Sequence, residues 1–216
     1  MKRGARNLSG IAGRILQSTL PFNGSPTPAA PQSLVSAVVR SRMTDYLTDR
    51  IPAGAMTLLM SSDHGKLAHD LAPACRMLFS ADADGNAAGT RYAPSAIDAD
   101  CDPTHLWLAE NSLDAAVLVN VLQRYEDPTP VLQELQRVLK DDGLLVLAMT
   151  TRPDSLSAGA WRGMMAMLGV PDVHAWQTQP LQAMLEAHWI VETADIPGEG
   201  LPMTIFVCTP ADGRRA

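Results

Sequence analysis

The sequence has few cysteines and no long apolar run. Its 216 residues include only three cysteines, which are far apart and form no CxxC pair: Cys75, Cys101 and Cys208. An odd number of isolated cysteines argues against a disulfide framework and against a zinc site. No stretch approaches the roughly 20 consecutive apolar residues that a membrane-spanning helix requires. These absences predict a soluble protein of a reducing compartment, and the cytoplasm is the expected location.

Acidic residues are missing from the first part of the chain. Residues 1–44 carry six basic side chains and no acid, and the first acidic residue is Asp45. The remaining residues carry 11 basic and 23 acidic side chains, and the whole chain has a net charge of −6. Because an acidic body repels phosphate groups, nucleic acid is not an expected partner.

The motifs of several enzyme classes are also missing. The sequence contains no GxSxG, HExxH, P-loop or zinc-deaminase pattern, each of which would place a known set of catalytic groups on one strand, helix or loop. The five histidines are isolated or poorly spaced for a shared metal ion, so no metal site is expected. Any activity must therefore depend on another kind of site.

Residues 1–20 are predicted to form a basic amphipathic helix or tail. Leu8, Ile11 and Ile15 recur at helical spacing, with Arg14 on the opposite side,. Three interpretations stay open: a helix that packs on the domain, a membrane-surface helix that makes peripheral contact, or an organelle transit peptide. Residues 21–32 contain four prolines and are predicted to be a linker,.

Residues 33–210 are predicted to form one domain, followed by a tail over 211–216. A helix is expected over 33–50, with Ser33 as its N-cap,. Further along, expected strands alternate with expected helices; the strands are 57–60, 76–80, 96–100, 115–119, 144–149, 189–195 and 203–209, and the helices are 66–73, 129–140, 159–168 and 178–187. This alternation predicts an α/β fold with a doubly wound, mainly parallel sheet of seven strands and helices on both faces. The short connection between the last two strands predicts an antiparallel hairpin.

The most informative segment is Ala109–Thr150. A buried strand is followed by a turn at Asp127 and Pro128 and by an amphipathic helix that Thr129 is expected to cap,. Gly143 is expected at the C-terminal position of this helix that glycine favours,.

This segment resembles class I S-adenosylmethionine-dependent methyltransferases, in particular the group that includes the quinone C-methyltransferases. The family pattern "dgSFDLV" is matched by "NSLDAA" from Asn111, "hvLeHleDp" by "NVLQRYEDP" from Asn120, and "RVLKPGG" by "RVLKDDG" from Arg137. "DPTHLWL", from Asp102, stands in the register of the family's "DaedLPF". The resemblance covers about residues 50–210 and implies a Rossmann-like methyltransferase fold with S-adenosylmethionine as the cofactor.

The resemblance implies a first cofactor loop with an acid-x-Gly-x-Gly-x-Gly pattern. Alignment on Gly65 places Leu59 at the acid, and Ser61 and Asp63 at the first two glycines. The side chain of Asp63 would stand where the methionine part of the cofactor lies in the family, unless the loop is reshaped. Its carboxylate could also meet the sulfonium or amino group favourably.

Three further cofactor positions follow from the resemblance. The acid that binds the ribose hydroxyls falls on Asp82, with Asp84 as the alternative. The acid that faces the adenine amine falls on Asp102, with Asp100 as the alternative, and an ordinary turn residue is the competing interpretation for each acid. Asn120 either faces the ligand or bonds to its own turn. The 20 residues between Asp82 and Asp102 show no helical period, so the helix that the family has there is expected to be absent or reduced.

Two functions fit these patterns. One is an S-adenosylmethionine-dependent methyltransferase acting on a small, hydrophobic molecule; the other is an inactive or repurposed methyltransferase-fold protein that serves as a binding or scaffold module. The histidine of the family's "hvLeHl" segment is replaced by Arg124, but methyl transfer can rely on positioning alone,. An apolar patch after the fifth strand is expected to be core or lid packing, or a flexible lining for an apolar substrate; it comprises Met164, Met165, Met167 and Leu168, with Trp161 and Trp176 nearby.

Overall fold

The computed structural model describes residues 37–61, 65–82, 96–98, 102–168, 174–196 and 203–211. The strands of its sheet are β1 (Ala55–Ser61), β2 (Cys75–Asp82), β3 (Ala96–Asp98), β4 (Leu113–Val119), β5 (Leu139–Thr150), β6 (Trp189–Ile196) and β7 (Met203–Pro210). The α-helices are α2 (Ala37–Arg50), α3 (Lys66–Leu71), α4 (Thr129–Val138), α5 (Ala158–Met167) and α6 (Thr178–Glu186). Two short 3-10 helices, η1 (Ala72–Ala74) and η2 (Leu122–Arg124), complete the described elements.

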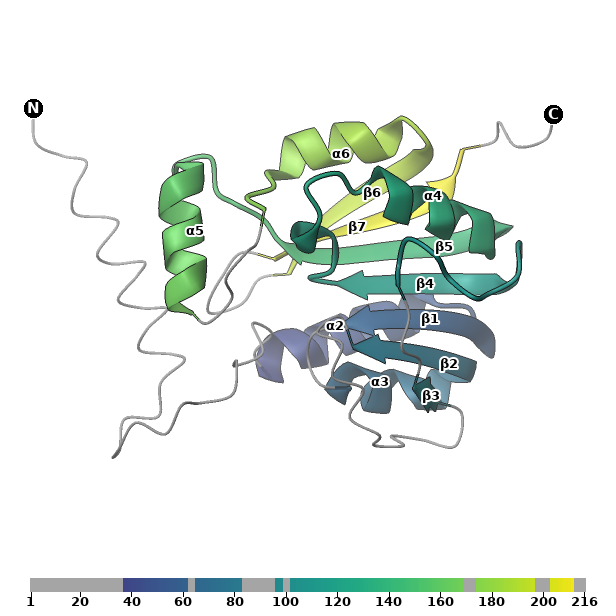
Figure 1. The fold of residues 1–216 in the computed structure, drawn as a ribbon. Coiled ribbons are helices and arrows are strands. Elements are labelled where there is room, and N and C mark those ends of the chain that lie inside the picture. Colours follow the sequence, from purple (N-terminus) through teal and green to yellow (C-terminus); the bar gives the residue numbers. More distant parts are fainter. Residues whose placement is uncertain are drawn as a thin grey trace, which may run out of the picture.

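The seven strands form one sheet in the order β3-β2-β1-β4-β5-β7-β6. Strands β1 to β5 pair in parallel, whereas β7 pairs antiparallel with both β5 and β6. The predicted mainly parallel sheet with a C-terminal antiparallel hairpin is therefore confirmed (Figure 1). The hairpin forms because too few residues separate β6 from β7 for a crossover helix.

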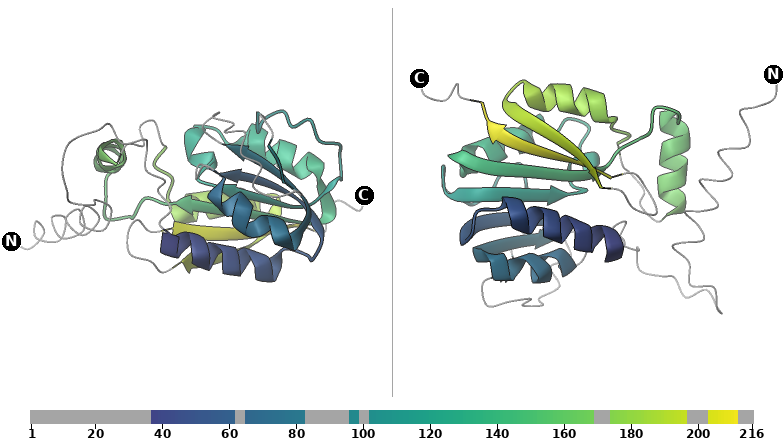
Figure 2. Two further views of the ribbon diagram at one scale, coloured as in Figure 1. Left: turned by 90° about the horizontal axis from the view of Figure 1, so that it is seen from below. Right: turned by 180° about the vertical axis from the view of Figure 1, so that it is seen from behind.

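Helices cover both faces of the sheet, as expected for a doubly wound fold. α2 and α3 lie on one face, and α4 and α6 lie on the other (Figure 2). The guanidinium of Arg40 on α2 bonds the carboxylate of Asp70 on α3 at 3.3 Å. The parallel strands are buried on both faces, which explains why they appear in the sequence as nearly continuous apolar runs.

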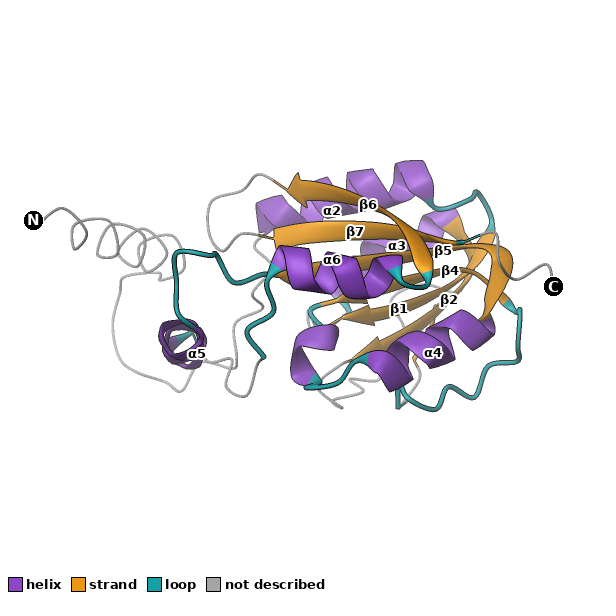
Figure 3. Cartoon of the chain, turned by 90° about the horizontal axis from the view of Figure 1, so that it is seen from above, coloured by secondary structure: helices purple, strands orange, loops and turns teal. Residues whose placement is uncertain are grey.

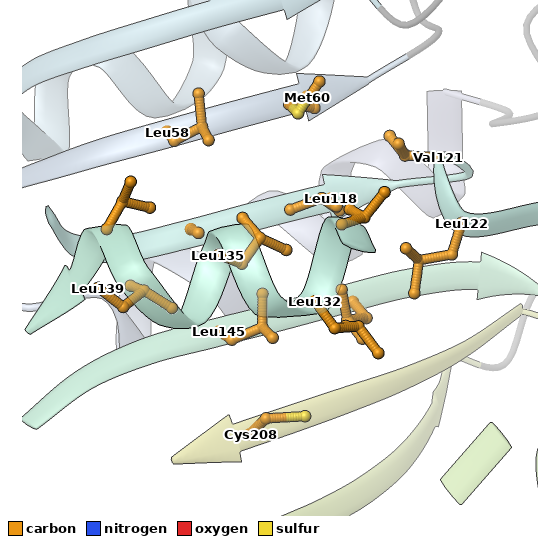
Figure 4. Packing of buried hydrophobic residues seen from close by; sticks show 14 of the residues in the cluster. Leu58, Met60, Leu118, Val121, Leu122, Leu132, Leu135, Leu139, Leu145 and Cys208 are labelled. Carbon is orange, nitrogen blue, oxygen red and sulfur yellow. The ribbon is translucent and has the colours of Figure 1, made fainter. Parts of the chain in front are cut away.

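The core consists of two layers, one on each side of the sheet. On the α4 side, Leu132 and Leu135 pack over Leu58, Leu118 and neighbouring strand residues (Figure 4). On the other side the alternate strand positions face apolar residues of α2 and α3, namely Met43, Leu47, Leu67 and Leu71. Each fully buried leucine contributes about 2 kcal/mol relative to an exposed one. Burial also raises the pKa of the Cys208 thiol, within the core, to about 12.

Three local predictions in this region are wrong. α4 ends at Val138, so the helix is two residues shorter than expected. Gly143 lies inside β5 instead of at a helix end, and a Cβ at this position would lie 2.9 Å from the carbonyl oxygen of Lys140. The glycine therefore permits a close backbone approach. Thr129 does not cap α4; its own N–H donates to Asp127 Oδ1 at 3.0 Å.

Other predictions lie outside the described residues. These are the amphipathic helix over 1–20, the linker over 21–32, the cap at Ser33 and the connection over 83–95. Among the described residues, no helix is long and apolar enough to cross a bilayer.

The polar groups at the amino ends of the central strands are paired with one another. Asp114 on β4 accepts a hydrogen bond from the N–H of Met56 on β1 at 2.7 Å and another from the ammonium of Lys140 on β5. Burial opposes ionisation of Asp114, but the bonds from Lys140 and Met56 outweigh it and lower the pKa of this carboxyl group. The carboxylate thus joins three neighbouring strands.

A second polar cluster holds the connection from β3 to β4 against α4. Arg137 forms a two-point ion pair with Glu134, with N–O distances of 2.6 and 2.9 Å. Its Nη2 also donates to the carbonyl oxygens of Leu106 and Leu108 at 3.0 and 2.9 Å. Glu134 in turn accepts from the N–H of Leu106 at 2.8 Å. The connection has no helix among residues 102–112, so these bonds fix its path.

Candidate functional site

The carboxyl ends of the parallel strands bring together several of the predicted cofactor residues. In the sheet register, Ser61 at the end of β1 pairs with Asp82 on β2 and with Val119 on β4. Asn120 directly follows Val119. From β1 the chain adds β2 and β3 on one side of β1, and then adds β4 and β5 on its other side. The carboxyl ends of β1 and β4 are therefore the topological switch point of the sheet. Ligands of open α/β sheets bind at such a point.

The loop after β1 is partly described. Ser61 is 3% exposed and ends the strand. Gly65 precedes α3 with a φ of 75°, a left-handed conformation that favours glycine,. Asp63 lies outside the described residues, as do the alternative acids Asp84 and Asp100, and the side chain of Asp82 is likewise not described. The structure therefore places Ser61 and Gly65 on either side of the predicted loop, and the backbone of Asp82 beside Ser61 at the end of β2.

Asn120 has the most unusual environment at this edge. Its φ is 57°, a left-handed conformation that asparagine tolerates better than most residues,. Its N–H donates to Ala148 at 2.8 Å, and its Oδ1 accepts from the N–H of Thr150 at 2.9 Å. The side chain of Asn120 therefore bonds the end of β5, 30 residues further along the chain, and not its own turn. However, the residue is 1% exposed and its Nδ2 has no hydrogen-bond partner. A buried donor without a partner costs about 1–3 kcal/mol.

Asp102 forms a local turn. Its Oδ1 accepts from both the N–H and the hydroxyl of Thr104, at 2.8 and 2.7 Å. These bonds lower the pKa of the Asp102 carboxyl group, with a smaller contribution from His105. The side chain is exposed and bonds only near neighbours in the sequence, as the interpretation of Asp102 as an ordinary turn residue predicts. Asp102 follows β3 and is not joined to Asn120 by any described contact.

A segment after α5 is bonded to the same edge of the sheet. The N–H of Arg152, just after β5, donates to the carbonyl of Trp176 at 2.8 Å, and the N–H of His174 donates to the carbonyl of Gln123 at 2.7 Å. The guanidinium of Arg152 bonds the carbonyls of Ala175 and Leu156. Residues 174–176 are therefore fixed to the ends of β4 and β5.

Trp176 is a second residue at this edge with a buried donor that lacks a partner. Its indole Nε1 is buried and makes no hydrogen bond. The side chain packs against the core on the α4 side of the sheet. Sequence reasoning placed Trp176 near the methionine patch but assigned it no role at the site. The available signal was an isolated tryptophan in the polar run "HAWQT" before a helix.

α5 lies beyond the carboxyl ends of the strands, apart from the layers of the sheet (Figures 1 and 3). Trp161 and Met165 of this helix are buried in a small apolar cluster separate from the main core, together with Leu156, Met164, Leu168 and Ala175. Met167 is 78% exposed. The predicted patch therefore forms a real cluster, with Met167 outside it.

The described part of the chain contains no group of three or more His, Cys, Asp or Glu side chains that could hold a metal ion. Among the same residues, the buried side-chain donors without a partner at the carboxyl edge are the amide of Asn120 and the indole of Trp176. Such an edge suits an organic ligand that carries hydrogen-bond acceptors.

Comparison with known protein families agrees with this geometry. Residues 53–147 match the model of a family described as "Methyltransferase domain". This stretch of the chain therefore resembles a methyltransferase domain, in agreement with the motifs of the sequence. The finer resemblance to quinone C-methyltransferases stays a prediction.

Solved structures have the same fold. The N-methyltransferase NodS from Bradyrhizobium japonicum, in complex with S-adenosyl-l-homocysteine, is 17% identical over 95% of this chain and 100% of its own, with a TM-score of 0.61. Geranyl diphosphate C-methyltransferase from Streptomyces coelicolor A3(2) is 12% identical over 79% of this chain and 77% of its own, with a TM-score of 0.61. The (4+2)-cyclase SpnF is 13% identical over 95% of this chain and 94% of its own, with a TM-score of 0.63. Identities this low show the fold alone, and no curated protein sequence matches the chain.

Proposed function

We propose that the protein is an S-adenosylmethionine-dependent methyltransferase acting on a small, hydrophobic molecule. The observation that carries this proposal is the buried Nδ2 of Asn120, which has no partner and lies at the switch point of a methyltransferase-type sheet. Native proteins satisfy nearly all such groups with protein, water or ligand. A ligand oxygen or nitrogen acceptor is what this donor lacks.

The described residues fit the cofactor in three respects. Gly65 has the left-handed φ that lets the backbone turn closely into α3. Asp82 ends β2 in register with Ser61, at the position from which an acid can bind ribose hydroxyls. Asn120 follows β4, which lies on the side of β1 opposite to β2, and its amide offers a donor without a partner. These three residues, with Ser61, would hold the cofactor.

S-adenosylmethionine supplies a methyl group on a sulfonium centre when it is bound. The protein holds the methyl acceptor in line with the sulfonium, excludes water and orients both molecules. Positioning of this kind can supply much of the acceleration of methyl transfer. No described side chain needs to act as a base for this purpose. Arg124 stands where the family has a histidine, which agrees with a mechanism based on positioning.

The apolar cluster on α5 supports a hydrophobic acceptor. Trp161, Met165 and their neighbours lie beyond the strand ends, and methionine adapts its shape to apolar ligands,. One structural neighbour was solved with geranyl diphosphate, so the fold admits an apolar chain.

Calorimetric titration with S-adenosylmethionine and S-adenosylhomocysteine tests the proposal. We expect binding at micromolar strength that Asp82→Ala weakens by at least about tenfold, the cost of a lost charge-assisted hydrogen bond. Asp142→Ala is the matched control, because this acid is exposed at the opposite end of β5. Absence of both heat and thermal shift at millimolar ligand would refute the proposal.

A second candidate is a repurposed or inactive methyltransferase-fold protein. It is favoured by the loop after β1, in which Ser61 and Asp63 stand at the first two glycine positions of the family pattern, and the Ser61 position is buried. SpnF, named as a cyclase, shows that this fold is found among proteins with other activities,. Cofactor binding without methyl transfer to any acceptor in a broad panel, followed by mass spectrometry, would favour this candidate.

A further inference from the structure

The indole N–H of Trp176 is buried, lacks a partner and lies at the edge where the proposed ligands bind. Tryptophan side chains normally place this N–H on an acceptor when it is buried. The Trp176 carbonyl accepts a hydrogen bond from the N–H of Arg152, and the N–H of His174 donates to the carbonyl of Gln123, so the backbone of the segment is held in place. The indole ring itself packs against the core. The hydrogen-bond acceptor that this indole N–H lacks is therefore a group that the described part of the protein does not supply.

Trp176 stands between the two apolar regions of the molecule. Its ring packs against the core on the α4 side of the sheet, which includes Val121 and Leu122 at the end of β4. The preceding residue, Ala175, packs against the cluster of Trp161 and Met165 on α5. A ligand that reaches the indole N–H from this junction therefore meets mostly apolar side chains.

A charged side chain, Arg152, contacts the same segment, and its bonds are directed at backbone carbonyls. The guanidinium of Arg152 is bonded to the carbonyls of Ala175 and Leu156. The buried donor without a partner in this segment is the neutral indole. A neutral donor in apolar surroundings favours an uncharged acceptor, because an indole N–H carries no charge that would offset the desolvation of an anion.

We propose that the indole N–H of Trp176 donates a hydrogen bond to an uncharged oxygen, a carbonyl or a hydroxyl, on an otherwise apolar methyl acceptor. Asn120 serves the cofactor side of the edge, and Trp176 serves the acceptor side. This inference rests on the proposed methyltransferase function, but it assigns a specificity-determining residue and a substrate class that the function alone does not give.

Nuclear magnetic resonance of the full chain tests the assignment. The protein has four tryptophans and hence four indole N–H signals, and the spectrum of Trp176→Phe identifies the signal of Trp176. The probes are tetralone and naphthol, each compared with a hydrocarbon of the same size, tetralin or naphthalene. They are titrated with and without saturating S-adenosylhomocysteine.

We expect tetralone or naphthol to move the Trp176 indole proton downfield, whereas the hydrocarbons leave it nearly unchanged. Trp176→Phe should weaken binding of the oxygenated probe by about tenfold, the usual effect of one hydrogen bond, and leave the affinity for S-adenosylhomocysteine unchanged. The matched control is Trp107→Phe, since Trp107 is 58% exposed and meets the ring of Phe79 on β2 edge to face.

Two results would overturn the inference. In the first, neither oxygenated probe moves the Trp176 signal, or the hydrocarbons move it equally. In the second, a long-lived water contacts the indole proton and stays there in the presence of the probes. Failure of the proposed function is distinct: no S-adenosylhomocysteine would bind, while the response of Trp176 to tetralone would persist.

Discussion

The two ends of the sheet treat their polar groups in opposite ways. At the amino ends, Asp114 pairs with Lys140 and Glu134 pairs with Arg137, and each pair also bonds backbone groups. At the carboxyl ends, the Nδ2 of Asn120 and the Nε1 of Trp176 are buried without partners. The polar side chains of the amino ends include residues of the strands themselves, Asp114 on β4 and Lys140 on β5, whereas Asn120 and Trp176 lie outside the strands.

This contrast separates stability from function. A satisfied polar network rigidifies the structure around it, whereas an unsatisfied buried donor costs free energy unless a ligand pairs with it. The amino ends should therefore respond to mutation in stability alone, and the carboxyl ends should respond mainly in ligand binding.

The largest expected effect on stability is at Arg137. Arg137→Ala removes the bonds to Leu106, Leu108 and Glu134, and we expect the free energy of unfolding to fall by about 2–3 kcal/mol. The control Arg162→Ala, on the exposed side of α5, should change it by less than about 0.5 kcal/mol. Urea denaturation measures both. A loss of cofactor binding by folded Arg137→Ala protein would break the division between the two ends.

At Asn120 the division predicts a loss of binding together with a moderate loss of stability. Asn120→Gly keeps the left-handed backbone but removes the amide, so we expect affinity for S-adenosylhomocysteine to fall by at least about tenfold. Asn120→Ala also loses the amide and adds backbone strain, which should lower the free energy of unfolding by a further 1 kcal/mol, approximately. Equal affinities of the two variants would assign the effect to the amide. Wild-type affinity in Asn120→Gly would show that the amide does not contact the ligand.

Asp114 gives a prediction that depends on pH. Its folded pKa lies below the ordinary value of 3.8, so its contribution to stability is fully present above that value and is lost as pH falls through the folded pKa,. Asp114→Asn should destabilise the protein by about 1 kcal/mol at neutral pH, because the pair with Lys140 is lost. Thermal unfolding of both proteins between neutral and strongly acidic pH measures the difference, which should shrink below the ordinary pKa. A constant difference would contradict the ionic role.

The smallest expected effect on stability is at Trp176. Trp176→Phe removes a donor that has no partner and keeps an aromatic ring against the core, so the free energy of unfolding should change by less than about 1 kcal/mol. Urea denaturation without ligand measures this change in the free energy of unfolding. A much larger loss would mean that the indole N–H has a partner within the folded protein.

The fold could be predicted from the sequence because each strand is a short apolar run and α4 shows clear helical spacing. Val131, Leu132 and Leu135 recur on one face of α4, and all three are buried. The error at Gly143 arose because glycine serves two purposes: it ends helices, and it permits close backbone approach. Only the packing against Lys140 distinguishes them.

The site could be predicted only in position. The family motifs placed Ser61, Asp82 and Asn120 at one edge, and the sheet register brings them together. What the sequence could not reveal is whether a polar group is satisfied. The Oδ1 of Asn120 bonds Thr150, 30 residues away, and the Nδ2 does not bond at all; this difference exists only in the folded chain.

The central claim is that the unpaired donors at the carboxyl edge are completed by ligand, and the side-chain amide signal of Asn120 tests it most directly. Nuclear magnetic resonance during titration with S-adenosylhomocysteine should show one amide proton of Asn120 moving downfield in proportion to the bound fraction, while the signal of the Lys140 ammonium or its neighbours stays fixed. Saturable binding of S-adenosylhomocysteine that leaves the Asn120 amide unchanged would contradict the account.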